Sequence, residues 1–267
     1  MDQLIRLYRY LFSSSKFYRI NRFLFKLSLR GIGVLNFENR NVSGELFVIN
    51  NILPKLLTSD KPIFFDVGAN IGEYTSDLKR RFPDSIIYSF EPHPDNYLKL
   101  KRKKEKNIEL LNIGLGETSG KYFLYDLADA DGTSRASQYH EVFSLATNEQ
   151  SKKFEIIITT LNEFTTSNNI QYIDFIKIDT EGSELAVLKG ASNLLAENRI
   201  GCIQFEFNEM NTVSRVFFRD FADLLEGYEF YRLLPNSIVK LDNSPVYNEI
   251  FAFQNILAVP SKFNLDL

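Results

Sequence analysis

The chain has a single cysteine, and this scarcity excludes two kinds of stabilising chemistry. One thiol, Cys202, cannot form a disulfide within the chain. Its place in the mostly apolar stretch 201–205 indicates the core of a strand, and a reducing compartment such as the cytoplasm suits it. With only two histidines as further candidates, the sequence contains no His/Cys cluster of the kind that binds zinc.

A strong excess of charge and long apolar runs are also missing. The net charge is only −3, so the chain as a whole gives no reason to expect a nucleic-acid partner. No uninterrupted apolar run reaches the length of a membrane span. A secretory signal is disfavoured as well, because basic residues recur along the N-terminal segment and no small-residue cleavage site follows it.

The composition favours one sizeable domain. The 267 residues are 44% hydrophobic and include 24 Phe and 13 Tyr, enough to bury a large core. Strand and helix patterns alternate as in repeated βαβ units. We expect strands at residues 63–67, 86–91, 108–113, 174–179, 201–207, 228–234 and 250–259. We expect helices at residues 72–82, 94–105, 184–197 and 213–226.

The first strand pattern leads into a loop typical of nucleoside-binding sheets. A hydrophobic run ends at Asp66 and is followed by Gly68 and Gly72, where a helical pattern opens. Dinucleotide sites use GxGxxG to hold a pyrophosphate, and that motif is absent here. The carboxylate of Asp66 would repel two phosphates but would suit the ammonium group of an amino-acid tail, as in S-adenosylmethionine. An ordinary tight turn is the alternative.

A second acid follows the next strand pattern. Glu91 lies nineteen residues after Gly72, near the spacing at which an acid commonly binds ribose hydroxyls. The prolines that follow it fit a helix start, so Glu91 could instead favour that helix through its dipole. Together the two acids favour a nucleoside site.

Three blocks resemble the FkbM family of S-adenosylmethionine-dependent methyltransferases: DVGANIGEYT at 66–75, FEPHPDNYLKL at 90–100 and FIKIDTEGSELAVLKGA at 175–191. The resemblance covers roughly residues 60–260 by order and spacing. It implies an α/β, Rossmann-like class I methyltransferase fold, with a seven-stranded, mostly parallel sheet and helices on both faces. It also implies an O-methyltransferase that uses S-adenosylmethionine.

The resemblance and the loop pattern together predict the residues that hold the methyl donor. The turn after the third strand should lie beside the adenine, so that the side chain of Asn112 or the backbone near Ile113 could contact the base. A Gly-rich hairpin turn is the alternative there. The predicted donor-binding residues are Asp66, Gly68, Ala69, Asn70, Gly72, Thr75, Glu91, Pro92, Asn112 and Ile113.

Acids at two later strand ends are the candidates for acceptor orientation and proton removal. Asp179 ends the fourth strand, and Glu206 ends the fifth, beside it. His140, in a polar insertion at residues 128–160, could act as general base or be a surface histidine. We interpret Glu184 as an acid in the first turn of a helix, and Ser183 as the N-cap residue of that helix. Two alternatives stay open for the strand-end acids: together they bind Mg²⁺, or one of them accepts the proton directly without a metal.

The N-terminal segment differs from the rest in charge. Residues 1–30 carry seven Lys/Arg and one acid, a net charge of +6, which leaves −9 for the remainder. Apolar residues fall at helical spacing between the basic ones. We expect residues 1–58 to form a basic amphipathic helical arm and residues 59–267 to form the methyltransferase domain. The arm could bind peripherally to the inner face of the membrane. Alternatively, it could pack on the methyltransferase domain or on a second subunit.

The acceptor is expected to be a hydroxyl on a sugar or surface glycan, which could be lipid-linked, because the polar insertion, the basic arm and the family resemblance favour such a substrate. A small secondary metabolite such as a polyketide is the alternative within the enzyme class. A nucleoside-binding, membrane-associated module without catalysis is the alternative outside it, and the acids at Asp179 and Glu206 argue against that. A nicotinamide dehydrogenase is opposed by the missing GxGxxG. The oligomeric state stays open.

Overall fold

A computed structural model describes residues 2–127, 151–263 and 265. Its centre is an eight-stranded sheet in the order β10-β9-β11-β8-β7-β1-β2-β3. Five neighbouring strands are parallel: β1 (Ile63–Val67), β2 (Ile86–Phe90), β3 (Ile108–Leu111), β7 (Ile173–Ile178) and β8 (Ile200–Phe207). The antiparallel β11 (Gln254–Pro260) lies between β8 and β9 (Tyr228–Leu234). The predicted Rossmann-like, mostly parallel sheet is therefore confirmed.

All seven strands expected from the sequence are present, and a short eighth is added at the edge. β10 (Ser237–Lys240) pairs antiparallel with β9 through a two-residue turn. Its four residues are too few to show a periodic pattern, so the sequence did not reveal it. The largest difference in bounds is at β11, which begins at Gln254 rather than at residue 250.

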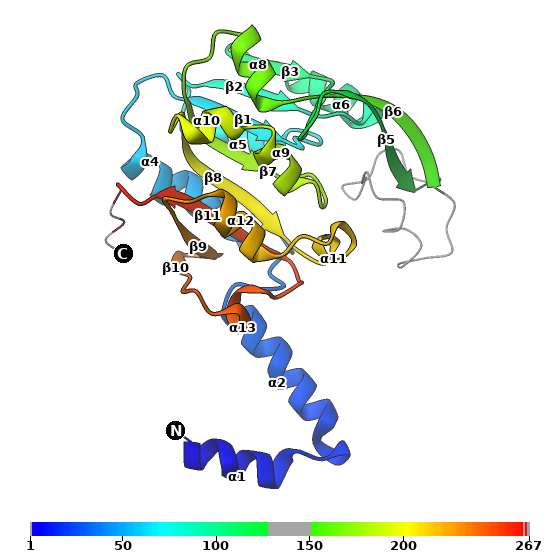
Figure 1. Cartoon of the computed structure of the whole chain (residues 1–267), viewed down its shortest axis with the longest axis vertical. Coiled ribbons are helices and arrows are strands. Elements are labelled where there is room, and N and C mark those ends of the chain that lie inside the picture. Colours follow the sequence, from blue (N-terminus) through cyan, green and yellow to red (C-terminus); the bar gives the residue numbers. More distant parts are fainter. Residues whose placement is uncertain (1, 128–150, 264, 266–267) are drawn as a thin grey trace.

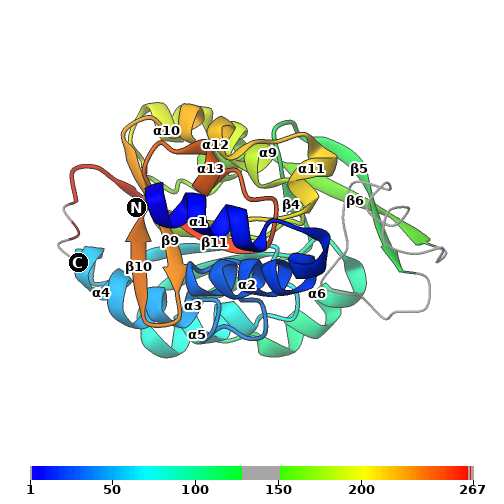
Figure 2. The ribbon, with the colours of Figure 1, turned by 90° about the horizontal axis from the view of Figure 1, so that it is seen from below.

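Helices cover both faces of the sheet, as expected (Figures 1 and 2). One face packs against α8 (Leu161–Ser167), α9 (Glu184–Lys189), α10 (Ser192–Ala196) and α12 (Phe218–Leu224). The other packs against α5 (Glu73–Arg81) and the helical stretch η2 (Val48–Ile52) and α4 (Leu53–Leu56). Shorter helical pieces are α3 (Glu45–Phe47), α6 (Pro94–Leu100), η3 (Lys101–Lys103), α11 (Met210–Ser214) and α13 (Pro245–Asn248). Each sheet face thus has its own hydrophobic core.

Three predicted helices are shorter than expected. The stretch 94–105 is α-helical over Pro94–Leu100 and continues as the 3₁₀ turn η3. The stretch 184–197 forms two helices, α9 and α10, that meet at Gly190. A Cβ at Gly190 would lie 2.0 Å from the backbone oxygen of Gly116, so close packing of two backbones occurs where the helix is interrupted. Within the stretch 213–226, α12 covers Phe218–Leu224, and the first two residues belong to the end of α11 (Met210–Ser214).

A second, three-stranded sheet has the order β4-β6-β5. It consists of β4 (Gly114–Leu115), β5 (Gly120–Leu127) and β6 (Ser151–Thr159). β5 and β6 pair antiparallel, with Leu124, Ile156 and Ile158 forming a small core. The last part of the predicted polar insertion is therefore a strand, which its alternating apolar residues support.

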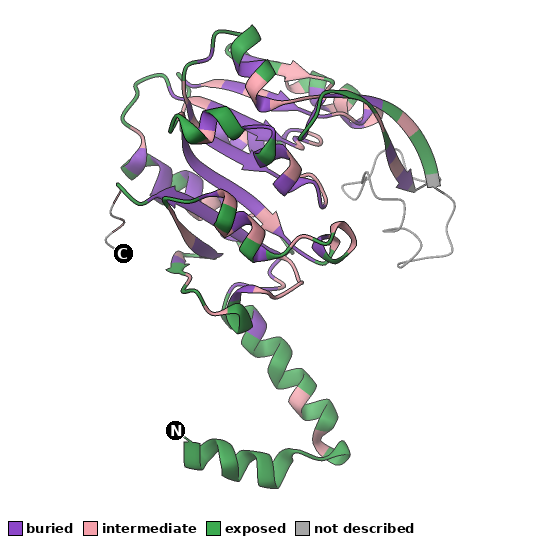
Figure 3. Cartoon of the chain, in the orientation of Figure 1, coloured by how far each residue is buried: buried purple, intermediate pink, exposed green. Residues whose placement is uncertain are grey.

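The N-terminal residues divide into an exposed part and a buried part (Figure 3). The exposed part, here called the arm, comprises α1 (Asp2–Phe12), η1 (Ser15–Phe17) and α2 (Tyr18–Gly31). None of the residues of α1 is buried, and in α2 only Leu29 is. The arm is therefore helical, and the alternative that it packs along its own domain is wrong. In the part of the chain that the structure describes, every helix is too short or too polar to cross a lipid bilayer.

The stretch η2–α4, by contrast, belongs to the core. Val48, Ile49, Ile52 and Leu53 are at most 1% exposed and pack against the sheet with α5. The division of the chain at residue 58 stays a prediction, but these helical turns are physically part of the folded body.

Candidate functional site

The loop between β1 and α5 is shaped by its two glycines. Gly68 has φ +81°, and a Cβ there would lie 1.7 Å from the backbone oxygen of Asp179. Gly72 has φ +77° and is the N-cap residue of α5, where a Cβ would lie 2.5 Å from Leu100 Cδ1. Positive φ and close approach both require glycine at these positions. The loop therefore lies directly against the end of β7.

Backbone hydrogen bonds hold this loop on the neighbouring strand. The N–H groups of Gly68 and Ala69 both donate to the Phe90 carbonyl, at 3.0 and 2.9 Å. The Gly72 N–H donates to the Ala69 carbonyl at 2.7 Å, and Asn70 takes a positive φ of 49°. The loop thus has a fixed course at the carboxyl end of the sheet, where ligands bind in open α/β folds.

Glu91 braces the same loop from the end of β2. Its Oε2 accepts from the Asn70 N–H at 2.7 Å, and its Oε1 accepts from the His93 N–H at 2.8 Å. Burial raises the pKa of the Glu91 carboxyl to about 7, although the two backbone hydrogen bonds act in the opposite direction. Each oxygen keeps a further lone pair, so the carboxylate can still accept from a ligand hydroxyl.

Asn112 and Ile113 occupy the predicted turn, but their side chains have structural partners. Asn112 Nδ2 donates to the backbone oxygens of Glu91 and Pro92, at 2.8 and 3.2 Å. Ile113 is partly buried and packs against the core of the α8–α12 face. Asn112 therefore ties its turn to the Glu91 loop, and an adenine contact by these residues stays a prediction.

Asp66 lies beneath the loop and is fully buried. Its Oδ2 accepts from Thr75 Oγ1 at 2.6 Å, and Thr75 Oγ1 is 2.8 Å from Ser89 Oγ. Asp66 Oδ1 has no hydrogen-bond partner among the described residues. Burial raises the pKa of this carboxyl, while the nearby Lys177 lowers it. The predicted donor residues Asp66 and Thr75 therefore bind each other, joining β1 to α5.

Asp66 is one member of a polar row that crosses four parallel strands. The register places Ser89, Asp66, Lys177 and Gln204 side by side on β2, β1, β7 and β8. From α5, the Tyr74 hydroxyl donates to Gln204 Oε1 at 3.1 Å, and its ring lies 4.8 Å from Lys177 Nζ. This buried row forms the floor under the carboxyl ends of the strands.

Lys177 provides the positive charge of that row. Its Nζ donates to Asp179 Oδ2 at 2.9 Å and lies 3.8 Å from Glu45 Oε1. Burial alone would lower the pKa of this ammonium, but Asp179, Glu45 and Asp66 together raise it. Lys177 is therefore a buried cation that holds the Asp179 side chain from below.

The predicted partners Asp179 and Glu206 line the same cavity. Asp179 directly follows β7, and Glu206 is the penultimate residue of β8. The residues before them, Ile178 and Phe205, are paired. Burial, and then the charges of Asp179 and Glu181, raise the pKa of Glu206 well above its usual range. Glu206 Oε1 also accepts from Asn208 Nδ2. The structure thus brings the two predicted acids together at one edge of the sheet.

The turn after Asp179 is held by Glu184. Thr180 N–H donates to Glu184 Oε1 at 2.8 Å and Gly182 N–H at 3.1 Å, and burial raises the pKa of this carboxyl to about 7. Glu184 is the first residue of α9, as predicted. Ser183 is the N-cap residue by position, but its side chain makes no capping hydrogen bond.

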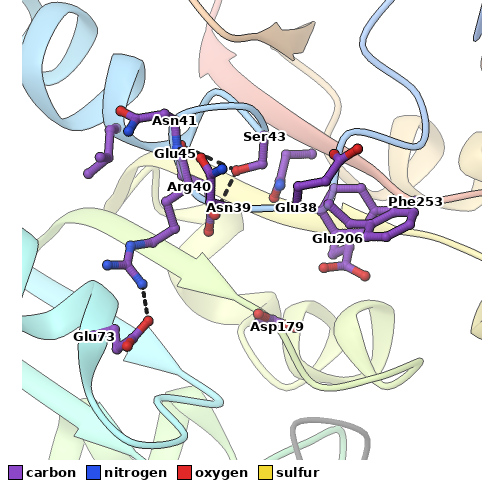
Figure 4. Close-up of a pocket in the computed structure, with 13 residues that line it drawn as sticks. Glu38, Asn39, Arg40, Asn41, Ser43, Glu45, Glu73, Asp179, Glu206 and Phe253 are labelled. Carbon is purple, nitrogen blue, oxygen red and sulfur yellow. Dashed lines mark hydrogen bonds and ion pairs between the residues drawn. The ribbon is translucent and has the colours of Figure 1, made fainter. Parts of the chain in front are cut away.

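The cavity above Asp179 and Glu206 has a volume of about 500 Å³ (Figure 4). Much of its wall comes from the segment 37–46, which precedes η2 in the chain. Arg40 Nε donates to Asp77 Oδ2 at 2.7 Å, and its Nη1 pairs with Glu73, so this wall is tied to α5. The remaining lining is mostly polar: Glu38, Asn39, Asn41, Ser43, Glu45 and Asn255, with Phe37, Leu46 and Phe253.

The structure does not test two predictions about the site, His140 as general base and the binding of a metal ion. His140, with most of the predicted insertion, lies outside the described residues. No group of three or more His, Cys, Asp or Glu side chains in residues 2–127, 151–263 and 265 is arranged to hold a metal ion. The proton-accepting role of His140 and the metal requirement therefore stay open.

Sequence reasoning missed the whole wall at residues 37–46, which includes Glu45, and it missed Lys177. Nothing in the pattern of residues 37–46 signals a site. Lys177 did carry a signal, because a lysine interrupts an apolar strand two residues before Asp179, and residues two apart in a strand face the same side. A buried charge at that position requires a partner.

The sequence matches the methyltransferase FkbM domain over residues 66–230. It is 28% identical over 161 residues to "Hexuronic acid methyltransferase AglP" of Haloferax volcanii, covering 58% of this chain and 60% of that protein. It is 26% identical over 148 residues to "Methyltransferase 1" of Beauveria bassiana, covering 49% and 59%. These matches span less than two thirds of either relative's length.

Two more distant matches cover more of the chain. The "2-O-methyltransferase NoeI" of Sinorhizobium fredii is 20% identical over 200 residues, covering 71% of this chain and 82% of that protein. The crystal structure of a methyltransferase FkbM from Methylobacillus flagellatus superposes with a TM-score of 0.49 at 16% identity, covering 80% of this chain and 47% of that one.

Proposed function

Because the chain belongs to the methyltransferase FkbM domain family and is therefore a methyltransferase, we propose that it transfers the methyl group of S-adenosylmethionine to a hydroxyl of a sugar or surface glycan. The observation that carries this proposal is the contact between the two halves of the site. The donor loop touches Asp179 at Gly68, and Asp179 in turn lines the cavity that also holds Glu206. A donor on the loop and an acceptor in the cavity would meet at Asp179.

The described residues fit the proposed donor. The loop at residues 68–72 lets a ligand approach its backbone, and Glu91 presents carboxylate oxygens beside it for the ribose hydroxyls. The donor carries a positive charge, which suits a crevice bordered by the carboxyls of Glu91 and Asp179. Asp66 and Thr75 are assigned to holding the loop from below, since both are buried and bonded to each other.

When bound, S-adenosylmethionine supplies an activated methyl group, whose carbon bonds to the acceptor oxygen as its bond to sulfur breaks. The chain's own task is to orient the hydroxyl and take its proton. Asp179 is the proposed proton acceptor, held in place by Lys177 at 2.9 Å. Glu206, whose pKa is raised by burial, is proposed to orient the hydroxyl through a hydrogen bond.

A metal-free site is favoured by Lys177. Its ammonium already lies 2.9 Å from Asp179, so a divalent cation bound there would meet a buried positive charge. We therefore expect turnover to survive prolonged treatment with EDTA. Loss of activity with EDTA, restored by Mg²⁺, would instead assign the two acids to a metal.

The lining of the cavity favours an uncharged, hydroxyl-rich acceptor. Asn39, Asn41 and Asn255 offer amide groups, and two aromatic rings, Phe37 and Phe253, lie 6.0 Å apart at its edge. The lining cation Arg40 is already paired with Glu73 and Asp77. A neutral sugar would be bound by such groups, whereas a carboxylated sugar would meet mainly acids in this part of the site.

A small secondary metabolite such as a polyketide is the second candidate. A cavity of about 500 Å³ is the size of many small-molecule sites, which is the observation in its favour. Incubation with labelled donor and a panel of neutral glycosides, uronides and small phenols would separate the two. Label on neutral glycosides supports the proposal, and label only on the phenols would replace it.

The residue roles are tested by Asp179→Asn, which keeps the shape but removes the proton acceptor. We expect turnover to fall by about 10²-fold or more, and donor affinity to fall far less, since Glu91 and the loop backbone still hold the donor after one nearby carboxylate is lost. Asp174→Asn is the matched control, because Asp174 is on the same strand and its Oδ2 accepts from the Ile63 N–H at 2.8 Å, away from the cavity lining. Equal turnover in both variants would show that Asp179 takes no part.

A further inference from the structure

Both helices of the arm are exposed along most of their length (Figure 3), and their exposed residues include large apolar ones. In α1, Leu4, Leu7, Tyr8 and Leu11 recur at helical spacing and are 45–71% exposed. In α2, Ile20, Phe23, Leu24 and Leu27 repeat the pattern and are 43–60% exposed. Contiguous apolar surface of this kind on a folded chain marks an interaction site.

Cations border these apolar faces. The arm carries seven Lys/Arg and one acid. In the described part of the chain, Arg30 is the one of the seven that forms an ion pair, with Glu38. The other six are Arg6, Arg9, Lys16, Arg19, Arg22 and Lys26, all exposed. A partner must therefore accept an apolar face and supply negative charge around it.

The bend between the two helices is held by specific contacts. The Tyr8 hydroxyl donates to Asn21 Oδ1 at 2.6 Å, and Asn21 Nδ2 donates to the Phe12 carbonyl at 3.0 Å. The ring of Phe12 lies 5.1 Å from that of Tyr8 and 5.2 Å from that of Phe17. The helices thus meet at a built corner, with α1 turned across the far end of α2 (Figure 1).

We propose that the arm docks on the anionic headgroup surface of a lipid bilayer. An amphipathic helix with long basic side chains lies in the membrane interface, its apolar face inserted and its Lys and Arg reaching the headgroups. Packing of the arm against the arm of a second copy is less suitable, because it would bring together two sets of six cations that have no ion pair within the described part of the chain. The docking surface does not depend on the identity of the methyl acceptor.

The position of the arm gives this docking a consequence for the enzyme. α2 ends at Gly31, and the chain then enters the segment 37–46 that lines the acceptor cavity. Leu35 N–H donates to the carbonyl of Phe253, another lining residue, at 2.7 Å. A docked arm would hold this cavity near the lipid surface, which suits a lipid-linked acceptor; this consequence, unlike the docking, rests on the proposed function.

The test is flotation of the full chain with vesicles of phosphatidylcholine alone or mixed with phosphatidylglycerol. We expect binding to the mixed vesicles, weakened by raising the salt concentration. The triple variant Arg19→Glu, Arg22→Glu, Lys26→Glu should reduce vesicle affinity by roughly tenfold or more. Its matched control is Lys101→Glu, Arg102→Glu, Lys106→Glu, with the same charge change at exposed positions of η3 and the turn after it.

Three outcomes would overturn the proposal. They are equal binding to both kinds of vesicle, equal loss in the two triple variants, and a dimer in light scattering that Phe23→Ser with Leu27→Ser converts to monomer. Circular dichroism checks that each variant is folded. Transfer of label to a soluble acceptor should be the same in the wild type and the arm variant, so a failure of docking is distinguishable from a failure of the proposed reaction.

Discussion

The proposed donor side and the proposed acceptor side of the site are built from different kinds of group. On the donor side, backbone N–H groups, two glycines and the carboxyl of Glu91 form the loop, all within a short stretch of β1, α5 and β2. On the acceptor side, charged side chains from distant segments meet: Glu45, Lys177 and Glu206 come from three separate parts of the chain. The two sides touch where Gly68 meets Asp179.

This difference means that the two sides should respond differently to substitution. A backbone loop tolerates no added side chain at its closest contact, but it does not depend on one charge. A cluster of buried charges is stable only when its opposite charges are paired. If one cation is lost, the remaining carboxylates are buried without a partner, and this destabilises the folded state. Four substitutions test this contrast, beginning with the largest expected effect.

Gly68→Ala should be the most damaging, because it affects the contact between the two sides. The new Cβ would lie 1.7 Å from the Asp179 oxygen at a φ of +81°, so a backbone must move. We expect the free energy of unfolding to fall by on the order of 4 kcal/mol. Gly227→Ala is the control, because its φ is +88° with nothing within 4 Å, and should cost only about 1 kcal/mol. Similar losses in urea unfolding would refute the close contact.

Lys177→Met should destabilise the acceptor side. It leaves Asp179 and Glu45 without their shared cation, which we expect to lower the free energy of unfolding by about 3 kcal/mol and to reduce turnover. Lys189→Met is the matched control, since Lys189 is exposed and lies 3.9 Å from Glu117, and it should change stability by less than about 0.5 kcal/mol. Thermal and urea unfolding measure the stability of both variants. Equal losses of stability would show that Lys177 does not stabilise the acceptor side.

Donor affinity should depend on pH through Glu91. Burial raises the pKa of its carboxyl to about 7, so the acceptor form needed for ribose hydroxyls is lost as the pH falls below that value. Between pH 8 and pH 6 the ionised fraction drops about tenfold, and donor affinity should weaken by a similar factor. Glu91→Gln should bind more weakly at pH 8 and show a flatter profile. Calorimetry at both pH values measures the donor affinity of the wild type and the variant. If affinity changes with pH as much in the variant as in the wild type, another group is responsible for the titration.

Arg40→Ala should have the smallest effect and should be confined to the acceptor side. Arg40 ties the cavity wall to Glu73 and Asp77, so its loss should raise the KM for the acceptor about fivefold and leave donor affinity unchanged. Arg80→Ala is the control, because Arg80 also pairs with Asp77 but is exposed and does not line the cavity. If donor binding weakens as much as acceptor binding, the two sides are not separable.

The donor side was readable in the sequence because its parts are close together in the chain. A strand, a glycine pair and an acid at a characteristic spacing predicted the loop at Gly68 and the placement of Glu91 beside it. The same logic placed Asp179 and Glu206 together, since the carboxyl ends of neighbouring parallel strands share one edge of a sheet. The side-chain role expected of Asp66 was less visible, because its burial under Thr75 depends on the packing of α5.

The acceptor wall was not readable, because its contacts span long distances in sequence. Arg40 reaches α5 across more than thirty residues, and Lys177 reaches Glu45 across more than a hundred. The sequence pattern also did not predict the edge strand β10, because that strand is too short. It did not predict the helix interruption at Gly190, because the interruption depends on packing against a distant loop at Gly116.

The sequence by itself determined the family, the alternating strands and helices, and the two acids at adjacent strand ends. Periodicity and motif spacing are local properties of the sequence. Because the ends of parallel strands meet at one edge of the sheet, these local patterns also indicate which strand-end residues lie together. Only the tertiary structure decided that residues 37–46 close the cavity, that Lys177 holds Asp179, and that the basic arm is exposed rather than packed on the body. These features arise from packing between segments far apart in the chain, and no local pattern encodes which of them will meet.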